Sequence, residues 1–204
     1  MTKQKEFDNL KRKMKEDKSL PLRKGATNLV LGEGNLNSAI VFIGEGPGYW
    51  EDQKGRPFVG AAGKFLDQLL LSIELPREDV FISNVVCYRP PGNRDPSPEE
   101  IGAFQPYIDR LIELISPKVI VTLGRFSMGK FIPGAKISSI HGGPQIVDWK
   151  DRKITVVPMY HPAAGLRRGE IKAQIFEDFR KLPEIMSKID EEENTKEVEQ
   201  MSLV

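Results

Sequence analysis

The sequence predicts a three-layer α/β/α sandwich, in which helices cover both faces of a central, mostly parallel sheet of four strands. Short apolar runs alternate along the chain with segments whose apolar residues recur at helical spacing. The 204 residues, of which 39% are hydrophobic, are enough for one sizeable core. Alternating strands and helices favour a parallel sheet covered on both faces. From the length of the chain we expect one domain, over residues 1–183. Residues 184–204 are expected to form an acidic, flexible tail.

The first half of the chain begins this alternation with a helix. Residues 3–16 carry apolar side chains at the i, i+3, i+7 spacing of an amphipathic helix, namely Phe7, Leu10 and Met14. The short apolar runs 28–31 and 39–43, separated by a turn-rich stretch, are predicted to be strands. Residues 63–73 return to helical spacing, and the β-branched run 80–86 is too short for a helix.

The second half repeats the alternation. Ser97, followed by a proline and two glutamates, has the features of a helix start, so a helix is expected from there to about Ile115. The apolar runs 118–123 and 154–157 are predicted to be buried strands. Residues 171–186 are predicted to form the closing helix.

Composition excludes several classes of protein. Cys87 is the only cysteine and there are two histidines, so we expect no internal disulfide and no metal site. Basic residues interrupt the N-terminal stretch and no apolar run reaches membrane-spanning length, which favours a protein of the cytoplasm. We also expect a monomer. Seven of the 29 acidic residues but only two of the 30 basic ones lie in residues 184–204, so the rest carries about +6. That charge permits a polyanionic partner without requiring one.

Loops that follow the predicted strands carry the candidate functional residues, which are Glu45, Asn84, Gly124 and His161. Ligands of open parallel sheets bind outside the carboxyl ends of the strands, so these residues should converge. Singly, each has a structural explanation, because Asn84 could cap a turn and Phe58 could belong to the core. The glycine-rich loop is no dinucleotide fingerprint, since Pro47 removes a backbone donor. The hypothesis therefore depends on the residues taken together.

Five short motifs, taken in order, carry a resemblance to a known family. They are Gly44-Glu45-Gly46-Pro47-Gly48, Gly55-Arg56-Pro57-Phe58-Val59-Gly60, Asn84-Val85-Val86, Arg89-Pro90-Pro91-Gly92-Asn93-Arg94 and His161-Pro162-Ala163. From about Asp17 to Arg180 the chain resembles the family 4 uracil-DNA glycosylases. The resemblance implies an enzyme of base excision repair that binds uracil-containing DNA near the nucleoid. Such an enzyme flips the nucleotide into a pocket and hydrolyses its N-glycosidic bond, leaving an abasic site.

The resemblance implies roles for three residues that would contact the uracil. Phe58 should stack on the base, since an aromatic face holds any planar heterocycle. Asn84 should donate to O4 and accept from N3–H, which cytosine cannot match. His161, in its neutral form, should donate to O2, where negative charge develops in the transition state.

Three further residues complete the implied pocket. Glu45 is expected to position the attacking water or to stabilise the cationic sugar. Gly46 lies where other families place an aspartate for that task and is expected to contact uracil. Gly48 lies where those families place an aromatic that excludes the thymine methyl, so Glu51 is the expected gate here.

The DNA contacts implied by the resemblance surround this pocket. Leu166 matches the loop that enters the duplex where the base has left, although the family usually has a second leucine at the position of Gly165. A smaller wedge predicts weaker extrusion from duplex DNA. Arginines are expected to contact phosphates, namely Arg89, Arg94, Arg167 and Arg168.

One departure from the family concerns its iron–sulfur cluster. Members normally bind a [4Fe-4S] cluster through four cysteines, whose positions fall here at Asp17, Leu20, Tyr88 and Phe104. Cys87 is one residue out of register. Because the cluster needs thiolates, we expect no cofactor, and we expect the leucine and the two aromatic residues to pack together and hold the N-terminal segment instead.

Three other functions are compatible with the sequence. The chain could be a catalytically idle relative that binds damaged or single-stranded DNA, although the retained Glu45, Asn84 and His161 argue against it. It could be a glycosylase for xanthine, hypoxanthine or mismatched thymine. A small-molecule nucleotide-binding protein would share the fold but be indifferent to DNA. Motifs that bind a sliding clamp are too short to identify in the acidic tail.

Overall fold

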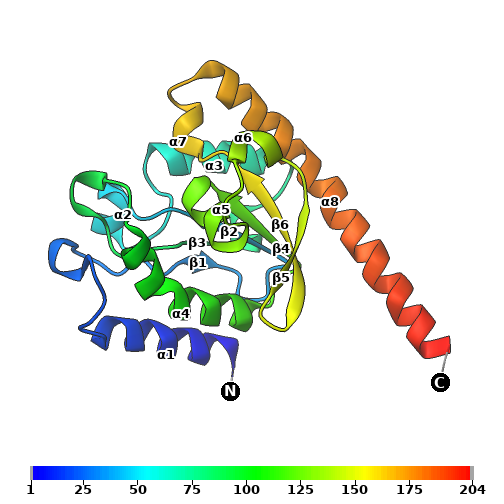
Figure 1. The fold of residues 1–204 in the computed structure, drawn as a ribbon, viewed down its shortest axis with the longest axis horizontal. Helices are drawn as coiled ribbons and strands as arrows, with labels where there is room; N and C mark the ends of the chain where they lie inside the picture. Colours follow the sequence, from blue (N-terminus) through cyan, green and yellow to red (C-terminus); the bar gives the residue numbers. More distant parts are fainter. Residues whose placement is uncertain (1, 203–204) are drawn as a thin grey trace.

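A single sheet with helices on both faces forms the body of the protein, as the computed structural model of residues 2–202 shows (Figure 1). The strand order is β1-β3-β2-β4-β6-β5. Four central strands are parallel, namely β3 (Phe81–Asn84), β2 (Ile40–Gly44), β4 (Val119–Leu123) and β6 (Arg152–Met159). The outer strands β1 (Glu33–Gly34) and β5 (Gln145–Trp149) pair antiparallel with their neighbours. The predicted α/β class is confirmed, but the predicted count of four strands is wrong, because the sheet has six.

Alternation along the central strands fills two cores and so creates three layers. On β2, Val41 and Ile43 belong to the core that also contains residues of α1 (Lys3–Glu16) and α4 (Pro98–Ile115). Ile40 and Phe42 point the other way, into the core shared with α3 (Ala61–Leu71) and α8 (Gly169–Ser202). Both faces are apolar because neither face of the parallel strands meets water.

Short helices and turns connect the longer elements. They are α2 (Tyr49–Lys54), α5 (Arg125–Phe131), α6 (Ile137–Ile140) and α7 (Pro162–Gly165), with the 3₁₀ turns η1 (Arg23–Gly25), η2 (Arg77–Asp79) and η3 (Pro91–Asn93). The predicted start of α4 is confirmed, since Ser97 and Glu100 form a reciprocal capping box. No helix within residues 2–202 is both long and apolar enough to span a membrane.

The two edge regions of the sheet differ from the prediction. Residues 28–31 are not a strand, although they run extended beside the end of β3. Their hydrogen bonds do not form the repeating ladder of a strand: Val30 donates its N–H to the Cys87 carbonyl at 2.8 Å, and the Ser83 hydroxyl donates to the Leu31 carbonyl at 2.6 Å. The pairing with β3 starts later, at Glu33. β5 was not predicted, because its exposed Ile146 and Asp148 leave no continuous apolar run.

The C-terminal helix is longer than predicted. α8 continues past Met186 to Ser202, and it extends away from the body of the molecule in Figure 1. Ile185 is 9% exposed in the core and Ile189 packs against the same core. Asp190 pairs with Lys118 at 2.6 Å. The packed unit therefore extends beyond residue 183, where the domain was predicted to end, while flexibility of 184–204 stays a prediction.

Candidate active site

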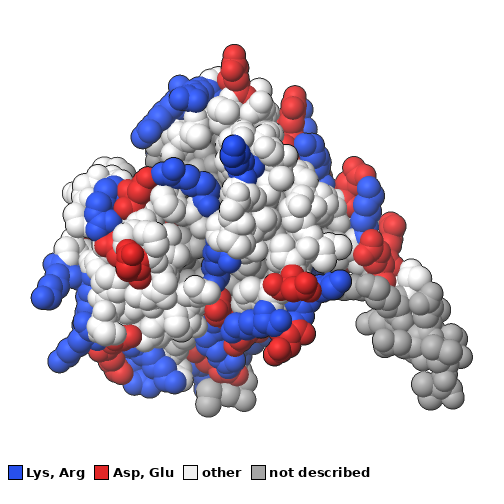
Figure 2. Space-filling model, viewed as in Figure 1, with Lys and Arg blue, Asp and Glu red and all other residues white. Residues whose placement is uncertain are grey.

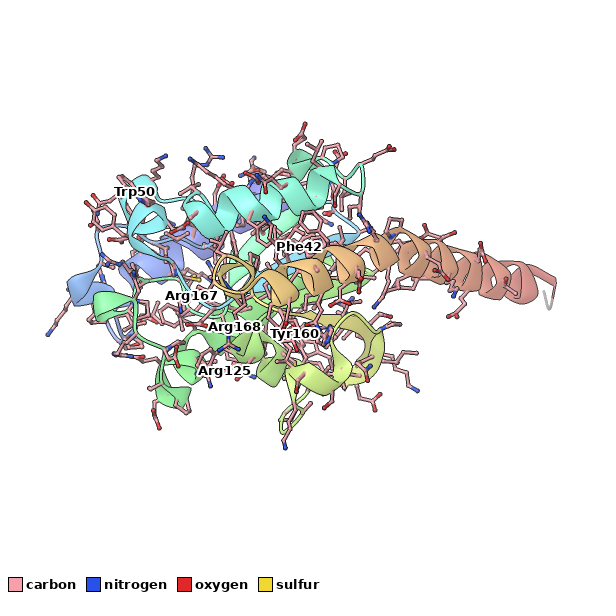
Figure 3. The ribbon with its side chains drawn as sticks, turned by 90° about the horizontal axis from the view of Figure 1, so that it is seen from above. Phe42, Trp50, Arg125, Tyr160, Arg167 and Arg168 are labelled. Atoms are coloured by element: carbon pink, nitrogen blue, oxygen red, sulfur yellow. The ribbon has the colours of Figure 1, made fainter. Side chains whose placement is uncertain are left out.

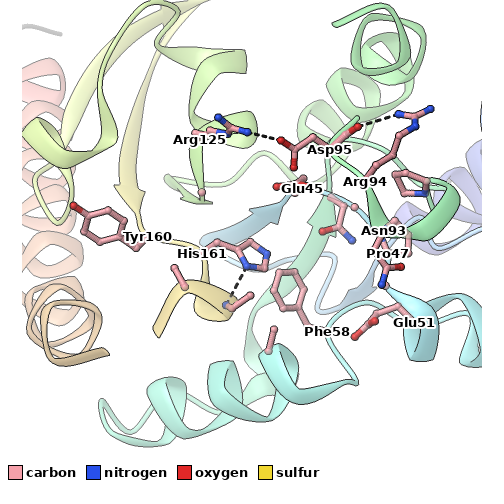
Figure 4. A pocket seen from close by; sticks show the side chains of 18 of the residues that line it. Glu45, Pro47, Glu51, Phe58, Asn93, Arg94, Asp95, Arg125, Tyr160 and His161 are labelled. Carbon is pink, nitrogen blue, oxygen red and sulfur yellow. Dashed lines mark hydrogen bonds and ion pairs between the residues drawn. The ribbon is translucent and has the colours of Figure 1, made fainter. Parts of the chain in front are cut away.

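A pocket of about 640 Å³ opens at the carboxyl ends of the parallel strands (Figure 4). The loops after β2, β3, β4 and β6 each contribute residues to it, which include Glu45, Asn84, Gly124 and His161. This is the edge at which parallel α/β sheets bind ligands, because the crossover connections diverge there. The convergence predicted from the sequence is present.

The side-chain amide of Asn84 lies at the buried base of this pocket. Asn84 ends β3 and is only 1% exposed, yet neither its Nδ2 nor its Oδ1 has a hydrogen-bond partner among the described residues. A Cβ atom on the neighbouring Gly44 would lie 2.5 Å from that Oδ1, so only glycine fits beside the amide. A buried amide without a partner is costly, and a ligand that supplies a donor and an acceptor would remove the cost.

Phe58 is held beside the amide in an unusual backbone conformation. Its φ of 51° is left-handed, which is rare for a bulky residue and is typical of functional sites. Gly63 makes this turn possible, since a Cβ atom there would lie 1.9 Å from the Phe58 carbonyl oxygen. The Phe58 ring stacks on the His161 ring, with 5.7 Å between centroids and 30° between planes. Two flat rings therefore form one wall of the pocket.

The protonation of His161 follows from its surroundings. Burial lowers its pKa to about 4, so the imidazole is neutral at physiological pH. The Ala163 N–H donates to the imidazole Nδ1 at 3.1 Å, drawn as a dashed line in Figure 4. Because Nδ1 accepts, the single proton of the neutral ring must be on Nε2. His161 therefore presents an N–H donor without carrying a positive charge.

The surroundings of Glu45 favour the protonated form of its carboxyl group. Partial burial, with a smaller effect from the nearby Asp95, raises the pKa of Glu45 to about 7, while Arg125 opposes the shift. Asp95 and Arg125 form an ion pair beside it (Figure 4). A carboxylate with a pKa near 7 is suited to proton transfer.

Glu51 and Asp52, neighbours on α2, each bind backbone of a different segment. Glu51, 8% exposed, accepts from the Val59 and Gly60 N–H groups at 2.8 and 2.7 Å. Asp52, 2% exposed, accepts from the N–H groups of residues 27 and 28 at 2.8 and 3.0 Å. The same short helix is thus joined both to the loop before α3 and to the N-terminal segment.

Glycines leave room around these side chains. A Cβ atom on Gly48 would lie 2.8 Å from Oε2 of Glu51, and one on Gly46 would lie 2.7 Å from Cγ2 of Val86. Neither position can hold a larger residue without displacement of its neighbour. An aspartate or an aromatic residue at these two positions would therefore require Glu51 or Val86 to shift.

The arginines predicted to contact DNA differ in position and in partners: Arg94 and Arg167 line the pocket, whereas Arg89 and Arg168 are not among its lining residues. Arg89 donates to Oδ1 of Asn93 at 2.6 Å. Arg94 forms a two-bond ion pair with Glu100, at 2.8 and 2.6 Å, so a phosphate would have to compete for it. Arg167 and Arg168 lie exposed on the turn between α7 and α8 (Figure 3). Basic side chains gather near α7 in Figure 2, whereas basic and acidic side chains are mixed around α2.

The predicted wedge is reduced to one side chain. Leu166 is 50% exposed at the end of α7, as expected for a residue that could enter a duplex. Gly165 beside it is buried, and a Cβ atom there would lie 2.8 Å from the Phe65 ring and 3.1 Å from Ile175. A second wedge residue at this position would collide with the core.

Several residues near the site were missed from the sequence. Arg125 directly follows Gly124 at a strand end and could have been suspected, whereas its pairing with Asp95, 30 residues away, could not. His141, for which its place before two glycines predicts a structural role or a phosphate contact rather than catalysis, is not among the residues that line the pocket; its Nδ1 lies 2.6 Å from a carboxylate oxygen of the buried Asp178. Two exposed aromatic residues, Tyr49 and Trp50, begin α2 next to the pocket.

Fold and pocket together define an α/β protein that can receive a planar heterocycle at the carboxyl edge of its sheet. Residues 31–181 match the family described as the Uracil DNA glycosylase superfamily, and the chain belongs to this superfamily. It is 44% identical to the type-4 uracil-DNA glycosylase of Archaeoglobus fulgidus, over 89% of this chain and 94% of that protein. It is also 44% identical to the type-4 enzymes of Sulfurisphaera tokodaii (88% and 84% of the two chains) and Thermotoga maritima (86% and 92%).

The four positions at which the resemblance implies cluster-binding cysteines hold other residues in this chain. The Tyr88 and Phe104 rings lie 6.1 Å apart, and Leu20 belongs to the same hydrophobic core. The fourth position, Asp17, accepts a hydrogen bond from the Tyr107 hydroxyl at 2.7 Å. Cys87 is fully buried, and burial raises the pKa of its thiol, which disfavours the thiolate. These residues do not fit a cluster, because its irons are bound by thiolates.

Proposed function

We propose that this chain is a monofunctional uracil-DNA glycosylase, which releases uracil from DNA and leaves an abasic site for base excision repair. The observation that carries the proposal is the buried amide of Asn84, whose donor and acceptor both lack a partner within the described chain. Membership of the superfamily and 44% identity to type-4 enzymes support it. Uracil-containing DNA is the partner that follows from this activity.

Recognition of uracil is assigned to Asn84 and Phe58. The Asn84 Nδ2 donates to O4 and its Oδ1 accepts from N3–H, which gives both buried atoms a partner. Cytosine presents an acceptor and a donor in the opposite order and is rejected. Phe58 stacks on the base, Gly46 allows the base to approach the loop, and the fixed carboxylate of Glu51 excludes the thymine methyl group.

Bond cleavage is assigned to His161 and Glu45. The C1′–N1 bond breaks with its electron pair on uracil, and the Nε2–H of His161 stabilises the charge that develops on O2. Water adds to the cationic C1′, and its proton passes to the Glu45 carboxylate. Uracil then leaves after taking up a proton at N1 from solvent. His161 transfers no proton in this reaction, because it acts as a neutral hydrogen-bond donor.

Uracil release should depend on pH through Glu45. Because Glu45 acts as a carboxylate and its pKa is about 7, kcat/KM should rise as pH increases through 7, and His161, with a pKa of about 4, should not titrate in this range. Asp95→Asn removes a negative neighbour and should shift the midpoint to lower pH. Glu45→Gln should be slow at every pH. A wild-type profile that stays flat from pH 6 to 8 would contradict the assignment.

The enzyme is also proposed to work without an iron–sulfur cluster. Purified protein from iron-supplemented cells should contain no stoichiometric iron and show no broad visible absorbance, and chelators should leave uracil release unchanged. Phe104→Ala should lower the free energy of unfolding by about 3–5 kcal/mol, since the fully buried ring packs where a cluster would otherwise join the N-terminal segment to the core. Iron at several atoms per chain would refute the proposal.

The direct test of the function uses a labelled oligonucleotide that contains one deoxyuridine. Incubation with the enzyme followed by hot alkali should break the strand at that position, whereas enzyme without alkali should not, because a monofunctional glycosylase leaves the sugar–phosphate chain intact. Oligonucleotides with hypoxanthine, xanthine or a mismatched thymine serve as comparisons. Breakage at one of these bases, and none at uracil, would replace the proposed substrate.

A further inference from the structure

Two exposed aromatic side chains lie at the entrance of the pocket and have no part in the proposed chemistry. Tyr49 is 49% and Trp50 is 56% exposed. The two residues come immediately after Gly48, which lines the pocket. The other large exposed hydrophobic side chains in the described chain are aliphatic, namely Leu71, Ile146 and Leu166. Figure 3 shows Trp50 on α2, at the end of the molecule that also carries Arg167.

Contacts with the pocket loops fix the position of this pair. The Tyr49 and Trp50 rings meet edge to face, with centroids 5.1 Å apart and planes at 78°. The Arg89 guanidinium lies 5.2 Å from the Tyr49 ring centroid. Cδ1 of Trp50 lies 3.7 Å from the position of a Cβ atom on Gly60, whose N–H binds Glu51. The aromatic pair is therefore positioned by the same groups that build the pocket.

Charge around the pair favours a nucleic acid strand over a protein or a lipid surface. Arg94, Arg125 and Arg167 line the pocket, and Arg89 lies against the Tyr49 ring. Cations that contact phosphates and aromatic rings that stack on bases are the two parts of a single-strand binding groove. The residues that follow on α2, Gln53 and Lys54, are exposed and polar, so no wide apolar patch surrounds the rings.

The reduced wedge indicates which form of DNA can use these rings. In a duplex, bases next to the uracil remain stacked and paired, and are not free to contact protein. In a single strand they are free, and no wedge is needed. The chain exposes only Leu166 at the wedge, since Gly165 faces Phe65 in the core.

We propose that Tyr49 and Trp50 form a stacking subsite for an unpaired base next to the uracil, so that the enzyme prefers uracil in single-stranded DNA. This inference rests on the proposed function and adds a substrate preference to it. The ligand of the subsite is the neighbouring base of the same strand, whose phosphate lies within reach of the arginines. Stacking strength varies little between bases, so the subsite tolerates any sequence.

The test combines a substitution in the protein with removal of one base from the substrate. Trp50→Ala should raise KM for a single-stranded deoxyuridine oligonucleotide about tenfold, within the range measured for loss of one stacked base, with kcat within twofold of wild type. Trp50→Phe should restore most of the loss. For the same strand in a duplex, KM should not change. Ile146→Ala, at an exposed position on β5, is the matched control.

An abasic spacer in place of the base on one side of the uracil keeps the phosphate and removes the stacking partner. On one of the two sides, the spacer should raise KM of the wild type about as much as Trp50→Ala does, and the two changes together should add nothing further. If Trp50→Ala raises KM equally with and without the spacer on either side, or raises it for duplex as well, the inference is wrong.

A binding measurement separates this inference from the proposed function. Trp50 is exposed, whereas Trp149 is 9% exposed, so an undamaged single-stranded oligonucleotide should quench the fluorescence of Trp50. Trp50→Phe should abolish the quenching. Quenching without any uracil release would support the subsite and refute the glycosylase activity. Uracil release with no quenching and no effect of Trp50→Ala would refute the subsite alone.

Discussion

His161→Ala should lower kcat for uracil release at least about 100-fold, a loss of about 2.7 kcal/mol of transition-state stabilisation. The neutral ring donates from Nε2, because its Nδ1 already accepts from Ala163 at 3.1 Å. That donor is most effective where negative charge develops on the leaving base, in a pocket with little water. Alanine removes the donor and also the ring that stacks on Phe58.

The other histidine provides the matched control for this measurement. His141→Gln keeps a hydrogen-bond donor near Asp178 and should leave kcat within a few-fold of wild type. Single-turnover cleavage of the deoxyuridine oligonucleotide measures both variants under the same conditions. Activity of His161→Ala within tenfold of wild type would remove His161 from the mechanism.

Asn84→Asp should reduce uracil release by about 1,000-fold or more. The aspartate has nearly the same shape but no Nδ2 donor, so it leaves O4 of uracil without a partner and places a carboxylate oxygen against it. Asn84 makes no side-chain hydrogen bond within the described protein, so the exchange breaks no internal hydrogen bond.

Two readouts show whether recognition is what changes. Free uracil should bind to the wild type and not to Asn84→Asp by calorimetry, and the ratio of uracil to cytosine release should fall in the variant. A variant that still binds uracil as tightly as wild type would show that another group reads the base edge. Melting temperatures of both proteins establish that the variant remains folded during the comparison.

The sequence predicted the centre of the sheet well because buried parallel strands are continuous apolar runs. The runs at 39–43 and 118–123 coincide closely with β2 and β4, whose residues are all buried. Edge strands lack this signal. β5 has exposed Ile146 and Asp148, and its partner is fixed only by the turn before β6. The run at 28–31 is apolar because it is buried, but its backbone bonds only at isolated points.

The candidate site was predictable to the extent that its residues lie in local motifs. Glu45, Asn84 and His161 each follow a strand, and the sheet brings strand ends together whatever the rest of the chain does. Two features depend on tertiary packing and carry no local signal. One is the Asp95–Arg125 pair, and the other is the backbone conformation of Phe58, which Gly63 allows.

The adjacent carboxylates of α2 have a consequence for local unfolding. Asp52 binds the backbone at residues 27 and 28, and Glu51 binds the backbone at residues 59 and 60. Since one helical turn joins both, loss of the N-terminal segment should release the residue proposed to exclude thymine. The four amides should then exchange with solvent deuterium as one cooperative unit. Substrate discrimination would thus depend on the stability of a segment that contacts no base.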